Sequence, residues 1–168
     1  EVLLDRDYAT EILSILKAED IKRLFIESTR TSVITAARYK EAFSPVELVY
    51  TDELDTHINE LRKIKTVEEK EKVLRAQRIA EQAFEKTLGV IRVGISERDI
   101  AAELEYHMRR GGSEGVSFDT IVVTGVNSSK PHGVPGNTLV AAGDLVTIDF
   151  GATYGGYHSD TTRTIAVG

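Results

Sequence analysis

The first 52 residues alternate between two patterns of apolar positions. The segments YATEILSILKA and TSVITAARYKEAF have the spacing of amphipathic helices, whereas IKRLFIE and PVELVY have the composition of short strands. This alternation is typical of a small α/β unit. Its first strands would have few neighbours, so we expect the unit to begin upstream of residue 1. The segment DELDTHINELRKIKT predicts a connecting helix and hinge over residues 53–65.

From residue 66 onward the helical signals are stronger. Thr66 and Glu69 have the spacing of a capping box, and the apolar stripe behind them predicts one long amphipathic helix. SERDIAAELEYHMRRGG predicts a second helix, with Ser96 as its N-cap and two glycines at its end. The rest of the chain favours strands, in VSFDTIVVTG, LVTIDFGAT and YHSDTTRTIAV, together with the loop VNSSKPHGVPGN.

The last two predicted strands carry one aspartate each. If Gly155 and Gly156 form a two-residue hairpin turn, Asp149 faces Thr162 and the small residue Gly151 faces Asp160, which leaves open space between the acids. Because side chains alternate between the faces of a strand, both aspartates then lie on one polar face. Their Cβ atoms would be a diagonal cross-strand pair, about 7 Å apart.

Two carboxylates at this separation repel each other unless a cation lies between them or one takes up a proton. Surroundings rich in oxygen and free of cysteine favour divalent cations such as Mn, Co, Zn or Mg. Carboxylates that bridge two ions about 3.5–4 Å apart are a familiar hydrolytic arrangement. Thr162, beside Asp149 in this register, is a candidate to orient a carboxylate. The alternative is that both acids face solvent and have no function.

Composition narrows the possible partners. The chain has 168 residues, 21 basic and 27 acidic, and a formal net charge of -6 without a dense Lys/Arg cluster, so we expect no nucleic-acid partner. Cysteine is absent, which excludes disulfides, thiolate zinc sites and a cysteine nucleophile, and suits a cytoplasmic protein. No apolar run approaches the roughly 20 residues of a membrane span, so we expect no membrane partner.

Three segments together, the loop KPHGVP and the strands GDLVTIDFGA and GYHSDTTRT, closely resemble the first half of the catalytic domain of the pita-bread metallopeptidases. This family holds Xaa-Pro dipeptidase (prolidase), aminopeptidase P, methionine aminopeptidase and creatinase. LRKIKTVEE resembles the linker of the prolidase and aminopeptidase P branch. The resemblance implies an α+β fold. Residues 66–168 would be the first half of a pita-bread domain, 53–65 the linker, and 1–52 the end of a smaller α/β N-terminal domain.

The resemblance also implies roles for individual residues. Asp149 would bind one metal ion, Asp160 would bridge two, and His132 would position the substrate or stabilise the tetrahedral intermediate. His158, next to the hairpin tip, would lie near the substrate entrance. The implied enzyme is a homodimer in the cytoplasm that hydrolyses small peptides with proline after the scissile bond, using a water activated by two divalent ions (Mn, Co or Zn).

The family completes its site with one histidine and two glutamates from the second half of the domain. We therefore expect this chain to be a fragment of a longer enzyme, with an incomplete metal site, poor binding of metal and no activity by itself. Two alternatives remain at this point: a pita-bread domain that serves as a binding module without catalysis, and a creatinase-like hydrolase.

Overall fold

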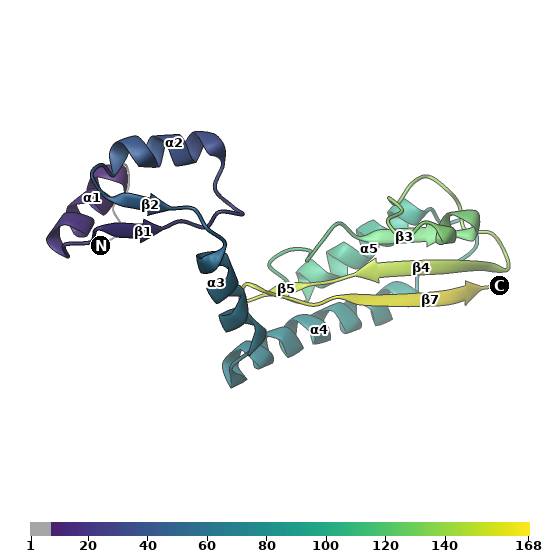
Figure 1. The fold of residues 1–168 in the computed structure, drawn as a ribbon. Coiled ribbons are helices and arrows are strands. Elements are labelled where there is room, and N and C mark those ends of the chain that lie inside the picture. The colour runs from purple at the N-terminus through teal and green to yellow at the C-terminus, as the bar shows by residue number, and fades with distance from the viewer. Residues whose placement is uncertain (1–7) are drawn as a thin grey trace. The chain divides into compact units, whose positions relative to one another are not determined.

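The computed structural model describes residues 8–168, which belong to two compact units, Glu1–Ile64 and Lys65–Gly168 (Figure 1). In the first unit the two strands are parallel and pair with each other. The alternation of helix and strand predicted from the sequence is thus confirmed, with shorter strands. The elements of this unit are α1 (Tyr8–Ala18), β1 (Arg23–Phe25), α2 (Val33–Ala42), β2 (Glu47–Val49) and α3 (Glu53–Lys63).

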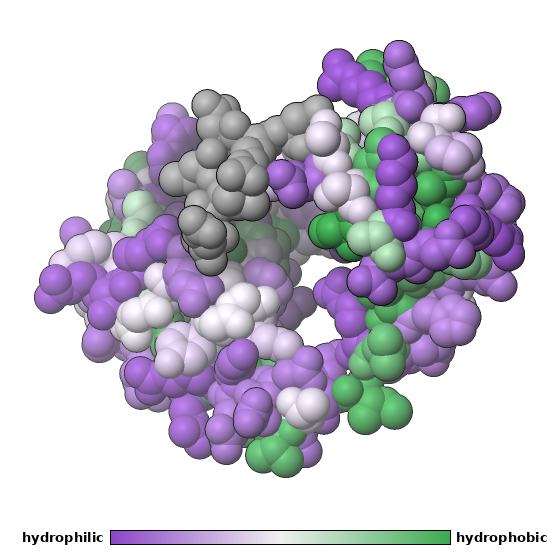
Figure 2. All heavy atoms as spheres, turned by 90° about the vertical axis from the view of Figure 1, so that its left-hand side faces the viewer, coloured by the Kyte–Doolittle hydropathy of each residue, from purple (hydrophilic) through white to green (hydrophobic). Residues whose placement is uncertain are grey.

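The first unit has a small core over the residues described. Its buried side chains are Leu16, Phe43, Val49 and, unusually for a charged residue, Asp55. α2 buries no residue completely. Figure 2 shows a surface that is mostly hydrophilic, with hydrophobic side chains exposed between the polar ones. Since little apolar surface is buried here, we expect polar contacts to matter for the stability of this unit.

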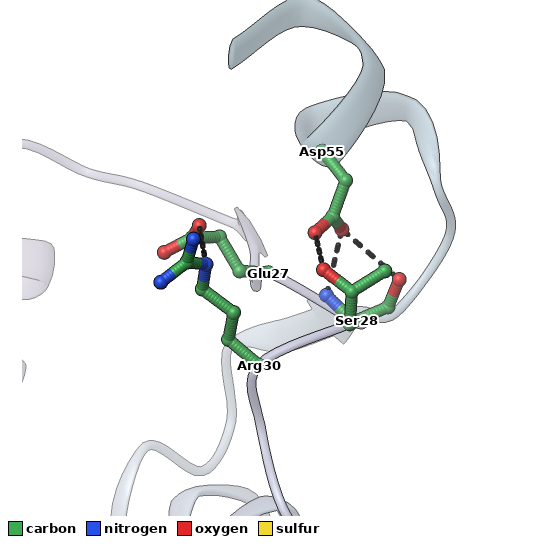
Figure 3. A network of polar contacts seen from close by, with 5 residues as sticks. Glu27, Ser28, Arg30 and Asp55 are labelled. Carbon is green, nitrogen blue, oxygen red and sulfur yellow. Dashed lines mark hydrogen bonds and ion pairs between the residues drawn. The ribbon is translucent and has the colours of Figure 1, made fainter. Parts of the chain in front are cut away.

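Asp55, in the first turn of α3, is the centre of such a contact (Figure 3). Its Oδ2 accepts hydrogen bonds from the backbone N–H of Ser28 at 2.8 Å and from the Ser28 hydroxyl at 3.0 Å, while its Oδ1 accepts one from Thr29. Glu27 and Arg30 form an ion pair in the same turn, at 3.7 Å. The hydrogen bonds, first that from the Thr29 hydroxyl, lower the pKa of Asp55.

Replacement of Asp55 by asparagine is expected to destabilise the first unit at neutral pH, because one amide oxygen cannot accept all three hydrogen bonds. A lowered folded-state pKa gives stability that is present above the unfolded-state pKa and is lost as pH falls through the folded-state value. The difference in urea midpoint between the two proteins should therefore shrink toward acid pH. The control is Asp52→Asn, since the Asp52 side chain makes no capping hydrogen bond. A difference independent of pH would contradict this prediction.

The second unit combines two helices with two small sheets (Figure 1). One sheet has the antiparallel order β3-β4-β7, and the other is the hairpin end β5-β6. No helix over residues 8–168 is long and apolar enough to span a membrane. The elements are α4 (Val67–Leu88), α5 (Glu97–Arg110), β3 (Ile121–Thr124), the 3-10 helix η1 (Gly125–Ser129), β4 (Asp144–Phe150), β5 (Thr153–Tyr154), β6 (Tyr157–His158) and β7 (Thr161–Val167).

The core of the second unit lies between the two helices and one face of the three-stranded sheet. Phe84 of α4 stacks on Phe150 of β4, with ring centroids 5.4 Å apart. Alternate residues of β4 point into this core, which leaves the residues between them for the opposite face. The buried members are Ile79, Ala80, Ala83, Ile100, Ala101, Leu104, Met108, Val122, Val140, Val146, Ile148, Phe150 and Ala152.

The helix starts predicted from the sequence are confirmed. Thr66 and Glu69 form a reciprocal capping box at α4, and the Ser96 side chain accepts from the Asp99 N–H at α5. Glu69 has a second partner, because the Tyr157 hydroxyl donates to its Oε1 at 2.7 Å. The Tyr157 hydroxyl and the Thr66 N–H together lower the pKa of Glu69. The start of α4 is thus tied to the hairpin.

The hairpin turn also forms as predicted. Gly155 and Gly156 both have positive φ, 57° and 75°, which a side chain would disfavour. Their N–H groups donate to the two carboxylate oxygens of Glu114, at 2.9 and 3.1 Å. The turn is thereby fixed in place, and with it the register of the strands that lead away from it.

Candidate metal centre

Asp149 lies on the face of β4 opposite the core. It pairs with Thr162 of β7, and the Thr162 hydroxyl donates to Asp149 Oδ1 at 2.7 Å. Two positions further along the same face, the hydroxyls of Thr147 and Thr164 are 3.1 Å apart. Asp149 is half-buried, so its carboxylate is accessible yet held in one orientation. The polar face predicted from the hairpin register is therefore present.

Asp160 directly precedes β7 and is not part of a regular strand, contrary to the expectation that each strand carries an aspartate. Its neighbours Ser159 and Thr161 are buried, and the Thr161 hydroxyl is hydrogen bonded to Gln77 of α4. Asp160 itself is exposed. This alternation places Asp160 on the same side as Thr162, and thus on the side of Asp149.

Gly151 does not leave open space between the two aspartates, so that expectation is wrong. Gly151 is buried, and a Cβ atom built on it would overlap the carbonyl oxygen of Ser159 and come within 2.8 Å of Ser117 Oγ. The glycine lets the opposite backbone approach closely, which brings the Asp149 and Asp160 segments together. The lack of a side chain at Gly151 therefore allows its backbone to pack against that of Ser159.

The loop with His132 lies against the same face of the sheet. Gly133 packs so closely on Val123 of β3 that a Cβ atom there would overlap the valine side chain. Val123 pairs with Thr147, and Ile121 pairs with Asp149, so the loop and the aspartate share a side of the sheet. His132 itself is exposed.

His132 also lines an open cavity of about 540 Å³, together with Phe118, Asp119 and Thr120. Thr120 carries a buried hydroxyl without a hydrogen-bond partner among the residues described. A buried hydroxyl without a partner costs stability, and a polar group on a bound molecule would relieve that cost. The cavity thus combines apolar walls with polar groups, as small-molecule sites do.

His158 stands apart from these residues on the short strand β6. It pairs with Thr153, and its Nδ1 is 3.0 Å from the Thr153 hydroxyl oxygen. The ring is exposed near the hairpin tip. A role at the substrate entrance stays a prediction.

The donor chemistry of this face fits a divalent metal, since Asp149 and Asp160 offer hard anionic oxygens on one side of the sheet. The set is small, however. Over residues 8–168 no group of three or more His, Cys, Asp or Glu side chains could hold a metal ion. The two aspartates therefore fit as part of a ligand set, and further ligands would have to join them.

Sequence reasoning missed Glu97. An acid in the first turn of a helix is explained by the helix dipole, so the sequence carries no signal for any other role. In the structure the carboxylate is completely buried and bonded to residues 27 and 39 positions away. Only the folded chain shows these partners.

Comparison with known proteins supports the resemblance. The model of metallopeptidase family M24 matches residues 71–168. The chain is 42% identical over 158 residues to an Xaa-Pro dipeptidase of Pyrococcus furiosus, which covers 94% of this chain and 44% of that protein. Two solved structures align with 99% of the chain and 46% of their own length. One is an Xaa-Pro dipeptidase from Bacillus anthracis (TM-score 0.91, 40% identity), the other an X-Pro aminopeptidase from Thermotoga maritima (TM-score 0.90, 37% identity).

The chain thus spans less than half the length of each of these relatives. The match includes the loop of His132 and both strands of the polar face. The α+β fold predicted from the sequence is confirmed, and it is consistent with half of a pita-bread domain. On this fold and these similarities, the chain belongs to metallopeptidase family M24, the pita-bread metallopeptidases.

Proposed function

We propose that this chain provides one half of the active site of a metal-dependent exopeptidase that cleaves Xaa-Pro bonds. The observation that carries the proposal is the polar face of β4 and β7, where Thr162 orients Asp149, and the alternation along β7 puts Asp160 on the same side. Relatives named as Xaa-Pro dipeptidase and X-Pro aminopeptidase support the substrate class.

In this proposal Asp149 and Asp160 hold the divalent metal ions, two in a complete site, and Thr162 fixes the orientation of the Asp149 carboxylate. Bound metal would lower the pKa of a water molecule and polarise the scissile carbonyl. His132, on its loop over the same face, positions the peptide or donates a hydrogen bond to the developing oxyanion. The cavity beside His132 accepts a substrate side chain.

The remaining ligands are supplied by residues beyond those described. Two carboxylates are too few to hold a pair of ions, and no third acidic, histidine or cysteine side chain within residues 8–168 joins them. The relatives are more than twice as long as their matched part, which leaves room for these ligands. The homodimer, the cytoplasmic location and the choice among Mn, Co and Zn are further parts of the proposal.

A full-length protein containing these residues is expected to hydrolyse dipeptides or peptides with proline in the second position. Activity should disappear on exhaustive chelation and return when Mn or Co is added, because the water needs a metal ion for its activation. The measurement is release of the N-terminal residue from matched Xaa-Pro and Xaa-Ala peptides. Activity that survives chelation would contradict the mechanism. Activity only on N-terminal methionine would contradict the substrate class.

A further inference from the structure

The loop that carries His132 is connected at both of its ends to one buried carboxylate, that of Glu97. The side chain of Glu97 is only 1% exposed. Its Oε1 accepts from the Thr124 N–H at 2.9 Å and from Asn127 Nδ2 at 3.0 Å, and its Oε2 accepts from the Gly136 N–H at 3.0 Å. Asn127 precedes His132 in the chain and Gly136 follows it.

The connection before His132 passes through Asn127. The Lys130 N–H donates to the backbone oxygen of Asn127 at 2.9 Å, and Lys130 Nζ donates to Asn127 Oδ1 at 2.7 Å. The side-chain amide of Asn127 reaches Glu97 with its nitrogen while its oxygen holds Lys130. Lys130, where the His132 loop begins, is therefore linked to the Glu97 carboxylate through a single residue, Asn127.

The connection after His132 is direct and is doubled by the backbone. Besides the bond from its N–H to Glu97, Gly136 accepts from the Arg98 N–H at 3.0 Å, and the Glu97 N–H donates to Thr138 at 3.1 Å. The start of α5 therefore holds the far end of the loop through backbone and side chain together. The five residues 131–135, including His132, lie between the two connections.

Burial of the Glu97 carboxylate has an energetic cost, and the start of a helix does not by itself require that burial. An acid at the first turn of a helix is favourable when it stays in water, whereas burial removes its hydration. Glu97 offsets the loss with three hydrogen bonds, all from elements that frame the His132 loop. The contacts therefore connect α5 to the loop.

We propose that Glu97 is a positioning residue, which holds the His132 loop over the face that carries Asp149. This inference rests on the proposed function in that His132 is taken as the group that meets the substrate. A loop of five residues between two fixed ends samples far fewer conformations than a free loop, so the imidazole is brought to the substrate already oriented.

The test is Glu97→Gln in this chain, followed by amide hydrogen exchange and by NMR of the His132 ring. A glutamine has one acceptor oxygen, so it can serve either Thr124 and Asn127 or Gly136, and one of the two side-chain connections of the loop is lost. We expect the amide that loses its acceptor, that of Gly136 or that of Thr124, to exchange about tenfold faster or more, as loss of a buried hydrogen bond predicts. The ring signals of His132 should broaden or double. Unchanged exchange and ring signals in the folded variant would overturn the proposal.

Glu103→Gln is the matched control. Glu103 lies on the same helix, is half-exposed, does not line the cavity beside His132 and loses the same charge on substitution. We expect it to leave the loop unchanged. If Glu97→Gln does not fold, Asn127→Ala removes the connection before His132 and leaves the Glu97 side chain unchanged. A loop as protected in Asn127→Ala as in the unchanged protein would equally overturn the proposal.

The same substitutions in a full-length protein distinguish the anchoring of the loop by Glu97 from its importance for Xaa-Pro hydrolysis. We expect Glu97→Gln to lower kcat about tenfold or more while the affinity for Mn stays the same, because the aspartates are not touched. A loosened loop with unchanged kcat would overturn the idea that this anchoring serves the reaction. If the unchanged protein shows no Xaa-Pro hydrolysis, the proposed function fails, and the exchange experiment still decides whether Glu97 holds the loop.

Discussion

Replacement of Asp160 by asparagine in a full-length protein is expected to remove nearly all Xaa-Pro hydrolysis. The substitution takes away an anionic oxygen donor from a face that offers only two within the described residues. An amide binds divalent cations more weakly than a carboxylate, and a water molecule is not activated where the ions are not held. Both kcat and metal affinity, the latter by titration calorimetry with Mn, should fall.

Thr162→Val provides the comparison, because it removes the hydrogen bond to Asp149 and keeps both carboxylates. Loss of such a supporting group costs roughly 10–100-fold in metal affinity or activity, so Asp160→Asn should have the larger effect. Asp52→Asn controls for the change in charge alone. Equal activity of Asp160→Asn and Asp52→Asn would rule out Asp160 as a metal ligand.

Gly151→Val is expected to lower the free energy of unfolding of the second unit by about 3 kcal/mol or more, at the upper end of what overpacking costs. The added side chain would meet the backbone oxygen of Ser159, which cannot rotate away as a flexible side chain does. The strands would have to separate next to both aspartates. Urea denaturation followed by circular dichroism measures the change.

Gly115→Ala is the matched control for this substitution. A Cβ atom at Gly115 has no heavy atom within 4 Å, so the change in stability should stay within about 0.5 kcal/mol. A Gly151→Val protein as stable as Gly115→Ala would show that the hairpin tolerates a wider strand separation than the structure implies.

The features that the sequence predicted are those set by local pattern. The capping box of Thr66 and Glu69 and the Gly155-Gly156 turn each depend on residues within four positions of one another. The Gly155-Gly156 turn then determines which residues of the strands on its two sides face each other. From that register came the pairing of Asp149 with Thr162, which the structure confirms.

The features that the sequence did not predict depend on contacts between distant segments. The role of Gly151 is decided by the Ser159 backbone, and that of Glu97 by the N–H groups of Thr124 and Gly136. The strand expected over VSFDTIVVTG is reduced to β3, preceded by an isolated bridge from Val116. Ser117 there donates to the oxygen of Ala152, and such side-chain bonds compete with a regular ladder. No local pattern distinguishes these outcomes.

The two hydrogen bonds that the Glu69 carboxylate accepts have a consequence for the order in which the second unit folds. The capping bond to Thr66 closes a loop of a few residues and can form early, whereas the bond from Tyr157 joins positions 88 residues apart. The entropy cost of closing so long a loop grows only with the logarithm of its length. We therefore expect helix α4 to start without the hairpin, and the second oxygen of the Glu69 carboxylate to gain its partner only after the hairpin has docked.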